Sequence, residues 1–199
     1  IAASTLLAND SDADTATDGQ VLTLSAVSPI AGATHGTVSL VTLADGSQQV
    51  NYVPDANYHG PAQFSYTVSD GAGGTATAVA TLNVQAVNDV PVAQGESASL
   101  DEDNAIVFTQ AQLLANDSDV DTATDGQVLT VAAVTGAQNG TVTLLVNSDG
   151  SGDVRFTPAA NYHGPARFSY TVSDGAGGTA EATVNLTVLP VNDTPVAQG

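Results

Sequence analysis

Hydrophobic and polar residues alternate in short runs along the chain, with a period of two. The clearest runs are Val50 and Tyr52; Phe64, Tyr66 and Val68; Val154 and Phe156; Phe168, Tyr170 and Val172; and Val184, Leu186 and Val188. This period is that of a β-strand with one buried face, and clusters of Gly, Asn, Asp and Pro between the runs indicate turns. A single helical turn is expected around residues 110–114. The chain is therefore predicted to be all-β, and several strands per roughly 100 residues favour a sandwich.

The second half of the sequence repeats the first. Residues 57–62 recur at 161–166, which gives a period of 104 residues, and the Asp-Gly-Ala-Gly-Gly segment that begins at Asp70 recurs at Asp174. We interpret this segment as a hairpin loop. Upstream the offset is 107 residues, so the first copy carries three additional residues around 28–34, which we expect in a loop.

The repeat predicts how the chain is divided into domains. The expected parts are 1–87, a copy that lacks its N-terminal strand; 88–191, a complete copy; and 192–199, the start of a further copy. Because Ile1 matches Phe108, we expect any signal peptide to precede Ile1, and we expect a longer array in which neighbouring repeats are the partners. An uncovered edge in the first copy allows an edge-strand dimer.

The ionisable residues are strongly unbalanced. The chain has 21 acidic residues against two basic ones, Arg155 and Arg167, and a net charge of −19. Such a charge disfavours nucleic acid and anionic lipid surfaces, and no apolar stretch reaches the roughly 20 residues that span a bilayer. The chain has no Cys, which excludes disulfides and thiolate metal sites. All acids but three are Asp, which supplies short, loop-borne carboxylates for a hard cation such as Ca²⁺.

The densest acidic motif is Asn9-Asp10-Ser-Asp12-Ala-Asp14, repeated as Asn116-Asp117-Ser-Asp119-Val-Asp121. Alternating acids of this kind resemble half of an EF-hand loop. An EF-hand also needs Gly at its sixth position and Glu at its twelfth, where this chain has Thr122 and Val128 in the second copy. The EF-hand interpretation is therefore rejected.

Four motifs in order resemble those of cadherin repeats. They are Asn88-Asp89-Val-Pro91, with its repeat Asn192-Asp193-Thr-Pro195; Asp101-Glu102-Asp103; Ala115-Asn-Asp117-Ser-Asp119; and Tyr170-Thr-Val-Ser-Asp174-Gly-Ala-Gly. The whole chain is similar to the cadherin-like, VCBS-type tandem repeats of large bacterial RTX-type or biofilm surface adhesins. Ala86 or Pro190 replaces the leading Asp of the cadherin linker, and Asn57-Tyr-His-Gly60 replaces its Asp-x-Glu segment.

This resemblance implies two tandem Ig-like/cadherin-like antiparallel β-sandwich domains joined by a short linker, and a Ca²⁺ site at the junction. The ligands it implies are Asn88, Asp89, Asp117, Asp119, Asp121 and Asp174, with less complete sets at Asp10, Asp12 and Asp70 and at Glu102, Asp103 and Asp193. The alternative is that these acids only cap turns and solvate loops.

The function expected from this resemblance is structural. The chain would be a calcium-dependent extender of a secreted adhesin on the surface of a Gram-negative bacterium, holding a ligand-binding tip, itself outside this fragment, away from the cell. The alternative is an adhesive module that binds carbohydrate directly or makes homophilic contacts. No Ser/His/Asp constellation recurs between the copies, so we do not expect an enzyme.

Overall fold

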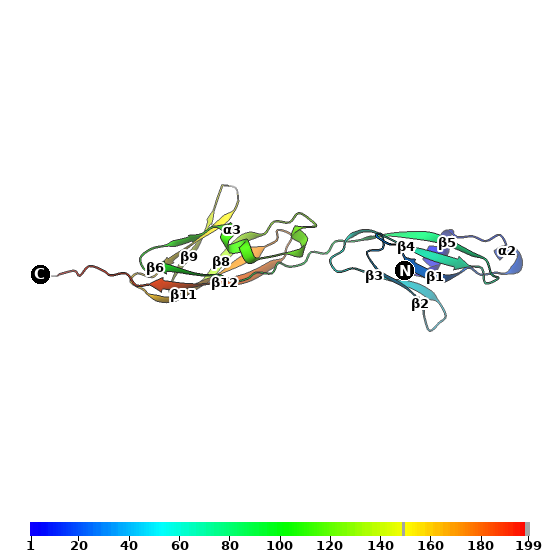
Figure 1. Ribbon diagram of the computed structural model, residues 1–199, viewed down its shortest axis with the longest axis horizontal. Helices are drawn as coiled ribbons and strands as arrows, with labels where there is room; N and C mark the ends of the chain where they lie inside the picture. The colour runs from blue at the N-terminus through cyan, green and yellow to red at the C-terminus, as the bar shows by residue number, and fades with distance from the viewer. Residues whose placement is uncertain (149, 198–199) are drawn as a thin grey trace. The chain divides into compact units, whose positions relative to one another are not determined.

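The computed structural model describes residues 1–148 and 150–197, and the chain divides into two compact units, Ile1–Val87 and Asn88–Gly199. We name them unit 1 and unit 2 (Figure 1). Each is a β-sandwich, which confirms the predicted all-β fold. The helices of the described residues are single turns, and none is long and apolar enough to cross a membrane.

Unit 2 contains two sheets that enclose one hydrophobic core. The first sheet has the order β6-β12-β11-β8, and the second has the order β7-β10-β9. The elements are β6 (Ser97–Asp101), β7 (Ile106–Phe108), α3 (Gln110–Leu113), η2 (Leu114–Asn116), η3 (Val120–Thr122), β8 (Thr130–Gln138), β9 (Gly140–Val146), β10 (Gly152–Pro158), β11 (Gly164–Ser173) and β12 (Thr179–Leu189). The predicted turn is α3, which begins with a capping box between Thr109 and Gln112.

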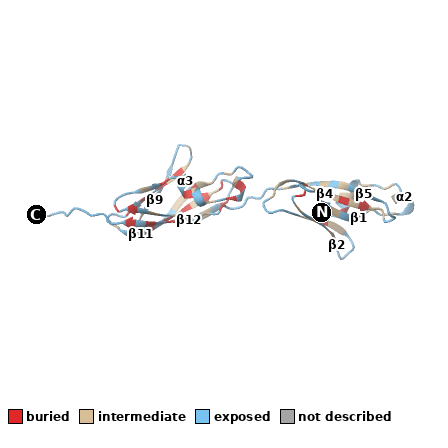
Figure 2. Ribbon diagram, in the orientation of Figure 1, coloured by how far each residue is buried: buried red, intermediate tan, exposed pale blue. Residues whose placement is uncertain are grey.

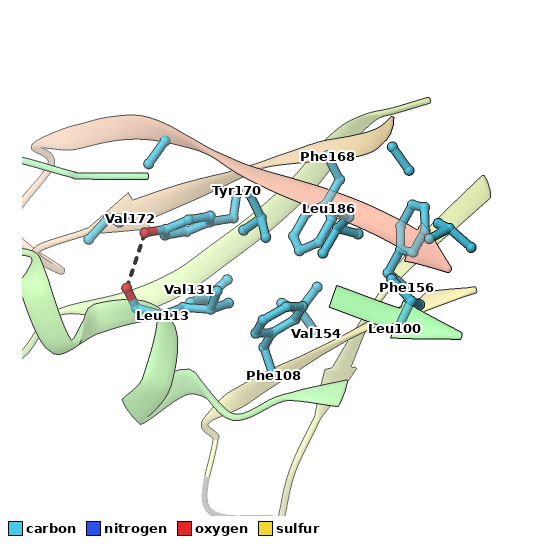
Figure 3. Close-up of a cluster of buried hydrophobic side chains, with 14 residues drawn as sticks. Leu100, Phe108, Leu113, Val131, Val154, Phe156, Phe168, Tyr170, Val172 and Leu186 are labelled. Carbon is cyan, nitrogen blue, oxygen red and sulfur yellow. Dashed lines mark hydrogen bonds between the residues drawn. The ribbon is translucent and has the colours of Figure 1, made fainter. Parts of the chain in front are cut away.

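The core of unit 2 follows the alternation seen in the sequence. Phe168, Tyr170 and Val172 on β11 are fully buried, and buried positions also alternate along β12 (Figure 2). The Phe168 ring lies 5.9 Å from the rings of both Phe108 and Phe156, which come from the opposite sheet (Figure 3). Burial of each large apolar side chain contributes about 1.5–3 kcal/mol, so these contacts hold the two sheets together.

Unit 1 has the same architecture with fewer strands. Its sheets have the orders β1-β4-β5 and β2-β3. The elements are α1 (Ala3–Leu6), η1 (Leu7–Asn9), α2 (Thr15–Asp18), β1 (Thr23–Pro29), β2 (Gly36–Thr42), β3 (Gln48–Pro54), β4 (Gly60–Ser69) and β5 (Thr75–Val84). Most of the expected insertion lies in the loop between β1 and β2. Ile1 exchanges two backbone hydrogen bonds of 2.8 Å with Val50, as an extended residue beside β3.

The two units differ in what pairs with the last strand of their final hairpin, which is β4-β5 in unit 1 and β11-β12 in unit 2. In unit 2, β12 pairs antiparallel with β11 and parallel with β6. The first strand of the unit, β6, therefore departs from the antiparallel sandwich that was predicted. In unit 1, β5 pairs only with β4 among the residues that the structure describes. The outer edge of β5 is therefore unpaired in this part of the chain.

Candidate metal centre

The segment that precedes β6 fixes the first predicted ligands. We call residues 88–95 the leading segment. Val92 exchanges two backbone hydrogen bonds of 2.7 and 3.0 Å with Ser118, while Pro91 is buried and Ala93 packs against the core. These contacts hold Asn88 beside the loops of unit 2 that carry the acids.

The Asp-Val-Asp motif forms the start of the short helix η3. Asp119 is its N-cap, and its Oδ1 accepts a hydrogen bond of 2.8 Å from the Asp121 backbone N–H. Asp121 Oδ2 in turn accepts a hydrogen bond of 2.8 Å from the Asp89 backbone N–H. Both carboxylates are buried, with 9% and 5% of their residue surface exposed. The motif therefore joins the leading segment to η3 through side-chain oxygens.

Asp174 begins the loop of the hairpin formed by β11 and β12, as predicted for this Gly-rich segment. Its Oδ1 accepts hydrogen bonds of 2.7–3.0 Å from the backbone N–H groups of Ala176, Gly177 and Gly178. Its Oδ2 accepts one of 2.8 Å from Asn88 Nδ2. The Asn88 amide, followed by these backbone N–H groups, lowers the pKa of Asp174 below its ordinary value. Gly178 is needed here because a Cβ would lie 2.1 Å from Asp174 Oδ2.

These contacts gather five predicted ligands at one end of unit 2. We call this set the acidic pole: Asn88, Asp89, Asp119, Asp121 and Asp174. Three of its carboxylates are buried, yet neither Arg155 nor Arg167 forms an ion pair with them among the described residues. Their negative charge is instead offset by backbone and amide N–H donors.

The donor chemistry of the acidic pole fits a hard cation. Carboxylate and amide oxygens are the ligands that Ca²⁺ prefers, and Asp119 Oδ2 is buried without a hydrogen-bond partner. The side chains are turned towards N–H donors instead. Over residues 1–148 and 150–197, no three Asp, Glu or His side chains converge closely enough to hold a metal ion. The chemistry of the set therefore fits calcium, whereas its present geometry is that of a hydrogen-bonded cap.

Asp117 has other partners. Its Oδ1 accepts a hydrogen bond of 2.7 Å from the Gln94 backbone N–H, and its Oδ2 lies 3.2 Å from Tyr170 Oη. The same hydroxyl lies 3.0 Å from Glu96 Oε1 and 3.1 Å from the Leu113 carbonyl oxygen (Figure 3). Burial raises the pKa values of both Tyr170 and Glu96. Both carboxylate oxygens of Asp117 are thus used to hold the leading segment on the core.

Sequence reasoning missed three polar residues that support this end of unit 2. Glu96 and Gln94 complete the Tyr170 network, and Gln127 Nε2 donates a hydrogen bond of 2.7 Å to Asn88 Oδ1. One signal was available: Gln127 has a counterpart, Gln20, at the offset of 107 residues that relates the two acidic motifs.

In unit 1 the corresponding acids are less enclosed. Asp12 Oδ1 accepts a hydrogen bond of 2.7 Å from the Asp14 N–H, and Asp70 Oδ1 accepts hydrogen bonds from its own hairpin loop. Asp10 Oδ1 lies 3.4 Å from Tyr66 Oη. Asp10, Asp12 and Asp70 are partly exposed and Asp14 is exposed, in contrast to the acidic pole.

The remaining predicted ligands lie at a different part of unit 2. Glu102 is 4% exposed, its Oε1 accepts a hydrogen bond of 2.7 Å from the Val191 N–H, and its Oε2 lies 3.9 Å from His163 Nδ1. Asp103 follows in a left-handed conformation with φ of 66°, and Asp193 is exposed. The structure brings Glu102 together with the end of β12, whereas Asp193 lies beyond it.

Comparisons with solved structures find several similar chains at low sequence identity. Human mucin-like protocadherin EC1-2 is 19% identical, with a TM-score of 0.46 over 87% of this chain and 86% of that one. Mouse PcdhgC3 EC1-3 is 13% identical, with a TM-score of 0.44 over 92% and 59%. An endo-fucoidan hydrolase of glycoside hydrolase family 107 is 19% identical, with a TM-score of 0.41 over 88% of this chain and 24% of that one. These TM-scores support no conclusion about function, and the chain spans about a quarter of the hydrolase. A search of curated proteins found no match.

Two family models match the chain in succession. Residues 1–83 match a bacterial Ig domain, and residues 87–189, just over half of the chain, match a cadherin-like domain. Domains of these two kinds are typical of extracellular surface proteins and are usually non-catalytic. The chain therefore belongs to the cadherin-like domain family.

Proposed function

We propose that the chain is a calcium-dependent structural extender of a secreted adhesin on the surface of a Gram-negative bacterium. In this role the repeats carry a ligand-binding tip and contribute length and stiffness rather than chemistry. The match to bacterial Ig and cadherin-like domains supports a surface location, and the tandem β-sandwiches support a structural role.

The observation that carries the calcium proposal is the gathering of three buried carboxylates in the acidic pole, where one oxygen, Asp119 Oδ2, has no hydrogen-bond partner. Asp119, Asp121 and Asp174 are 9%, 5% and 3% exposed in a chain with a net charge of −19. Like charges repel one another more strongly in a poorly solvated environment than in water. A divalent cation would remove this repulsion, whereas screening by dissolved salt reaches buried charges only weakly.

Three carboxylates of the acidic pole would hold the ion. Asp119 offers its unpartnered Oδ2, Asp121 offers the carboxylate whose Oδ2 accepts the Asp89 backbone N–H, and Asp89 offers the exposed carboxylate of the residue that donates this N–H. Asp174 would act mainly through Asn88, because its own oxygens already accept several N–H groups. Calcium binding requires the coordinating side chains to turn from their N–H donors towards the ion.

The exposure of the aromatic residues favours an extender over a carbohydrate-binding module. Sugar recognition commonly uses an exposed aromatic ring, whereas all four Phe and two of the five Tyr are buried. The other three, Tyr52, Tyr58 and Tyr162, are half-buried, and each uses its hydroxyl to hold a backbone carbonyl of its own unit. The aromatic residues are therefore used within the fold.

Thermal unfolding in EDTA and in millimolar Ca²⁺ tests the proposal. A ligand at about 100 times its dissociation constant stabilises the folded state by about 2.7 kcal/mol, and about 1 kcal/mol corresponds to about 4 °C for a domain of this size. We expect the unit 2 midpoint to rise by about 10 °C with calcium. An unchanged midpoint would contradict the calcium proposal.

The duplication supplies a matched control. The double substitution Asp119→Asn and Asp121→Asn should abolish the calcium response, since it removes two carboxylates from the acidic pole. The corresponding double substitution Asp12→Asn and Asp14→Asn changes partly or fully exposed acids of unit 1 and should leave the unit 2 response intact. An equal loss in both variants would show that calcium acts through overall charge and not through this site.

A further inference from the structure

Gln127 follows the loop that carries the acids of η3. The Asp121 carbonyl oxygen accepts a hydrogen bond of 2.9 Å from the Asp125 backbone N–H, which closes this loop. Gly126 then adopts a left-handed conformation with φ of 71°, which residues with a side chain rarely take. The side chain that follows meets the leading segment, where Gln127 Nε2 donates a hydrogen bond of 2.7 Å to Asn88 Oδ1.

The hydrogen bonds of Asn88 fix the orientation of the Gln127 amide. A carboxylate only accepts hydrogen bonds, so Asn88 turns its Nδ2 towards Asp174 Oδ2, at 2.8 Å. Asn88 Oδ1 therefore faces Gln127 and accepts from its Nε2. A reversed Gln127 amide would bring two oxygens together. Gln127 Oε1 is thus the end of the amide that Asn88 leaves unused.

This oxygen is buried and has no hydrogen-bond partner among the residues that the structure describes. The same feature occurs in unit 1. Gln20, the counterpart of Gln127 at the offset of 107 residues, also has a buried Oε1 without a partner, and Gly19 before it has φ of 69°. Buried polar atoms without a partner are few in folded proteins, so their recurrence at one position of both copies indicates a ligand for this oxygen.

A second unpartnered oxygen belongs to the loop that Gln127 follows. Asp119 is 9% exposed, and its Oδ2 is buried without a hydrogen-bond partner in the described part of the chain. A cation can bind Asp119 Oδ2 and Gln127 Oε1 without taking either from an N–H donor. Both oxygens of Asp174, in contrast, already accept N–H groups.

The amide oxygen also fits the coordination that Ca²⁺ requires. This ion takes about six to eight oxygen ligands, and the side-chain carbonyl of Gln is one of the groups it accepts. We propose that Gln127, through Oε1, is a ligand of the cation at the acidic pole, an inference that rests on the proposed calcium function.

A neutral ligand suits this position better than a further acid. The chain has a net charge of −19 and the acidic pole already holds three buried carboxylates, so another carboxylate would add repulsion whenever no ion is bound. The Gln127 amide supplies an oxygen without that charge, and its Nε2 holds Asn88 at the same time. Gln127 thus links the ion to the leading segment.

Two substitutions separate the two ends of this amide. Gln127→Ala removes the oxygen and the N–H donor together, whereas Gln127→Glu keeps an oxygen at the same reach and removes only the donor. Isothermal titration calorimetry with Ca²⁺ should show Gln127→Ala weakened by at least about tenfold and Gln127→Glu binding at least as tightly as the wild type. Equal weakening in both variants would overturn the proposal, because it would show that Gln127 acts only by holding Asn88.

Terbium luminescence lifetimes in H₂O and D₂O count the water molecules on the bound ion directly. The host is the chain with Asp12→Asn and Asp14→Asn, so that the signal reports on unit 2. Loss of a protein ligand admits water to the ion, so Gln127→Ala should raise the count by about one, whereas Gln127→Glu should keep the wild-type count. An unchanged count in Gln127→Ala would contradict direct coordination.

Gln138→Ala provides the matched control. Gln138 is an exposed glutamine at the end of β8, outside the acidic pole, and its loss should change neither the affinity nor the water count. Circular dichroism in EDTA identifies any loss of folding. A wild-type chain that binds neither Ca²⁺ nor Tb³⁺ would refute the calcium function itself. A wild-type chain that binds both, with Gln127→Ala indistinguishable from it, would refute only the role of Gln127.

Discussion

Tyr170→Phe removes one oxygen atom from the network that ties the leading segment to the core of unit 2. The hydroxyl lies at 3.0–3.2 Å from four acceptors: the carbonyl oxygens of Gln94 and Leu113 and the carboxylates of Glu96 and Asp117. Tyr170 itself is 0% exposed. The ring remains in place after the substitution, so the change isolates the hydroxyl from the packing.

The hydroxyl carries one proton and donates to one of these acceptors at a time, so the magnitude is that of one hydrogen bond to a buried acceptor. A hydrogen bond to a charged group contributes about 1.5–3 kcal/mol, and a buried acceptor left without a donor adds its desolvation cost. We therefore expect unit 2 to lose about 2–3 kcal/mol of unfolding free energy, or about 8–12 °C in its midpoint. The counterpart in unit 1 is much weaker, because Tyr66 Oη lies 3.4 Å from both of its acceptors. Tyr66→Phe should cost at most about 1 kcal/mol.

Scanning calorimetry of the wild type and the two variants at pH 7 in EDTA provides the comparison. Each substitution should move only the transition of its own unit, and the shift for Tyr170→Phe should exceed that for Tyr66→Phe by a factor of about two or more. Equal shifts, or a Tyr170→Phe variant within about 0.5 kcal/mol of the wild type, would refute the claim that this hydroxyl holds the leading segment.

Three further substitutions test single contacts in unit 2. Burial raises the pKa of Glu96, so its contribution to stability is present below its pKa in the unfolded chain and is lost as pH rises through its pKa in the folded chain. Glu96→Gln should therefore be more stable than the wild type near pH 7. Unfolding midpoints measured from pH 3.5 to 7.5 should show the gap between variant and wild type narrowing in acid. Gly178→Ala places a Cβ 2.1 Å from Asp174 Oδ2 and should cost about 1–3 kcal/mol in urea unfolding; a neutral result would show that the loop relaxes freely. Thr109→Ala removes a capping box and should cost about 1 kcal/mol by the same assay, whereas Thr109→Ser should restore most of it.

The strands and the core were predictable because burial on one face forces a period of two. Phe168 and Val172 alternate with polar neighbours, and both are fully buried as the alternation requires. The parallel pairing of β6 was not predictable from this pattern, since alternation specifies which face is buried and not the direction of the neighbouring strand. The turn Ala3–Leu6 was missed although it corresponds to the predicted turn α3, because Ala2 and Thr5 stand where α3 has the capping residues Thr109 and Gln112.

The candidate site was predictable in its residues and not in its contacts. The sequence identified Asp117 and Asp119 as equivalent members of one motif, whereas the structure uses the first in the Tyr170 network and the second in the acidic pole. Asp174 illustrates the same limit. An Asp before a Gly-rich turn suits both an ion and the N–H groups of its own loop, and only tertiary packing shows that the N–H groups occupy it here.

The parallel pairing of β6 with β12 determines how unit 2 responds to tension. The two strands run side by side from Ser97 opposite Asn185 to Asp101 opposite Leu189. The chain enters β6 at one end of this ladder and leaves β12 at the other, so a pull on both ends of the unit shears the strands along their length. All the hydrogen bonds between them then bear the load together, whereas a hairpin pulled from its open end breaks its bonds one at a time. The strand order thus sets the resistance of unit 2 to force. This resistance depends on the rate of forced unfolding and not on the free energy of unfolding.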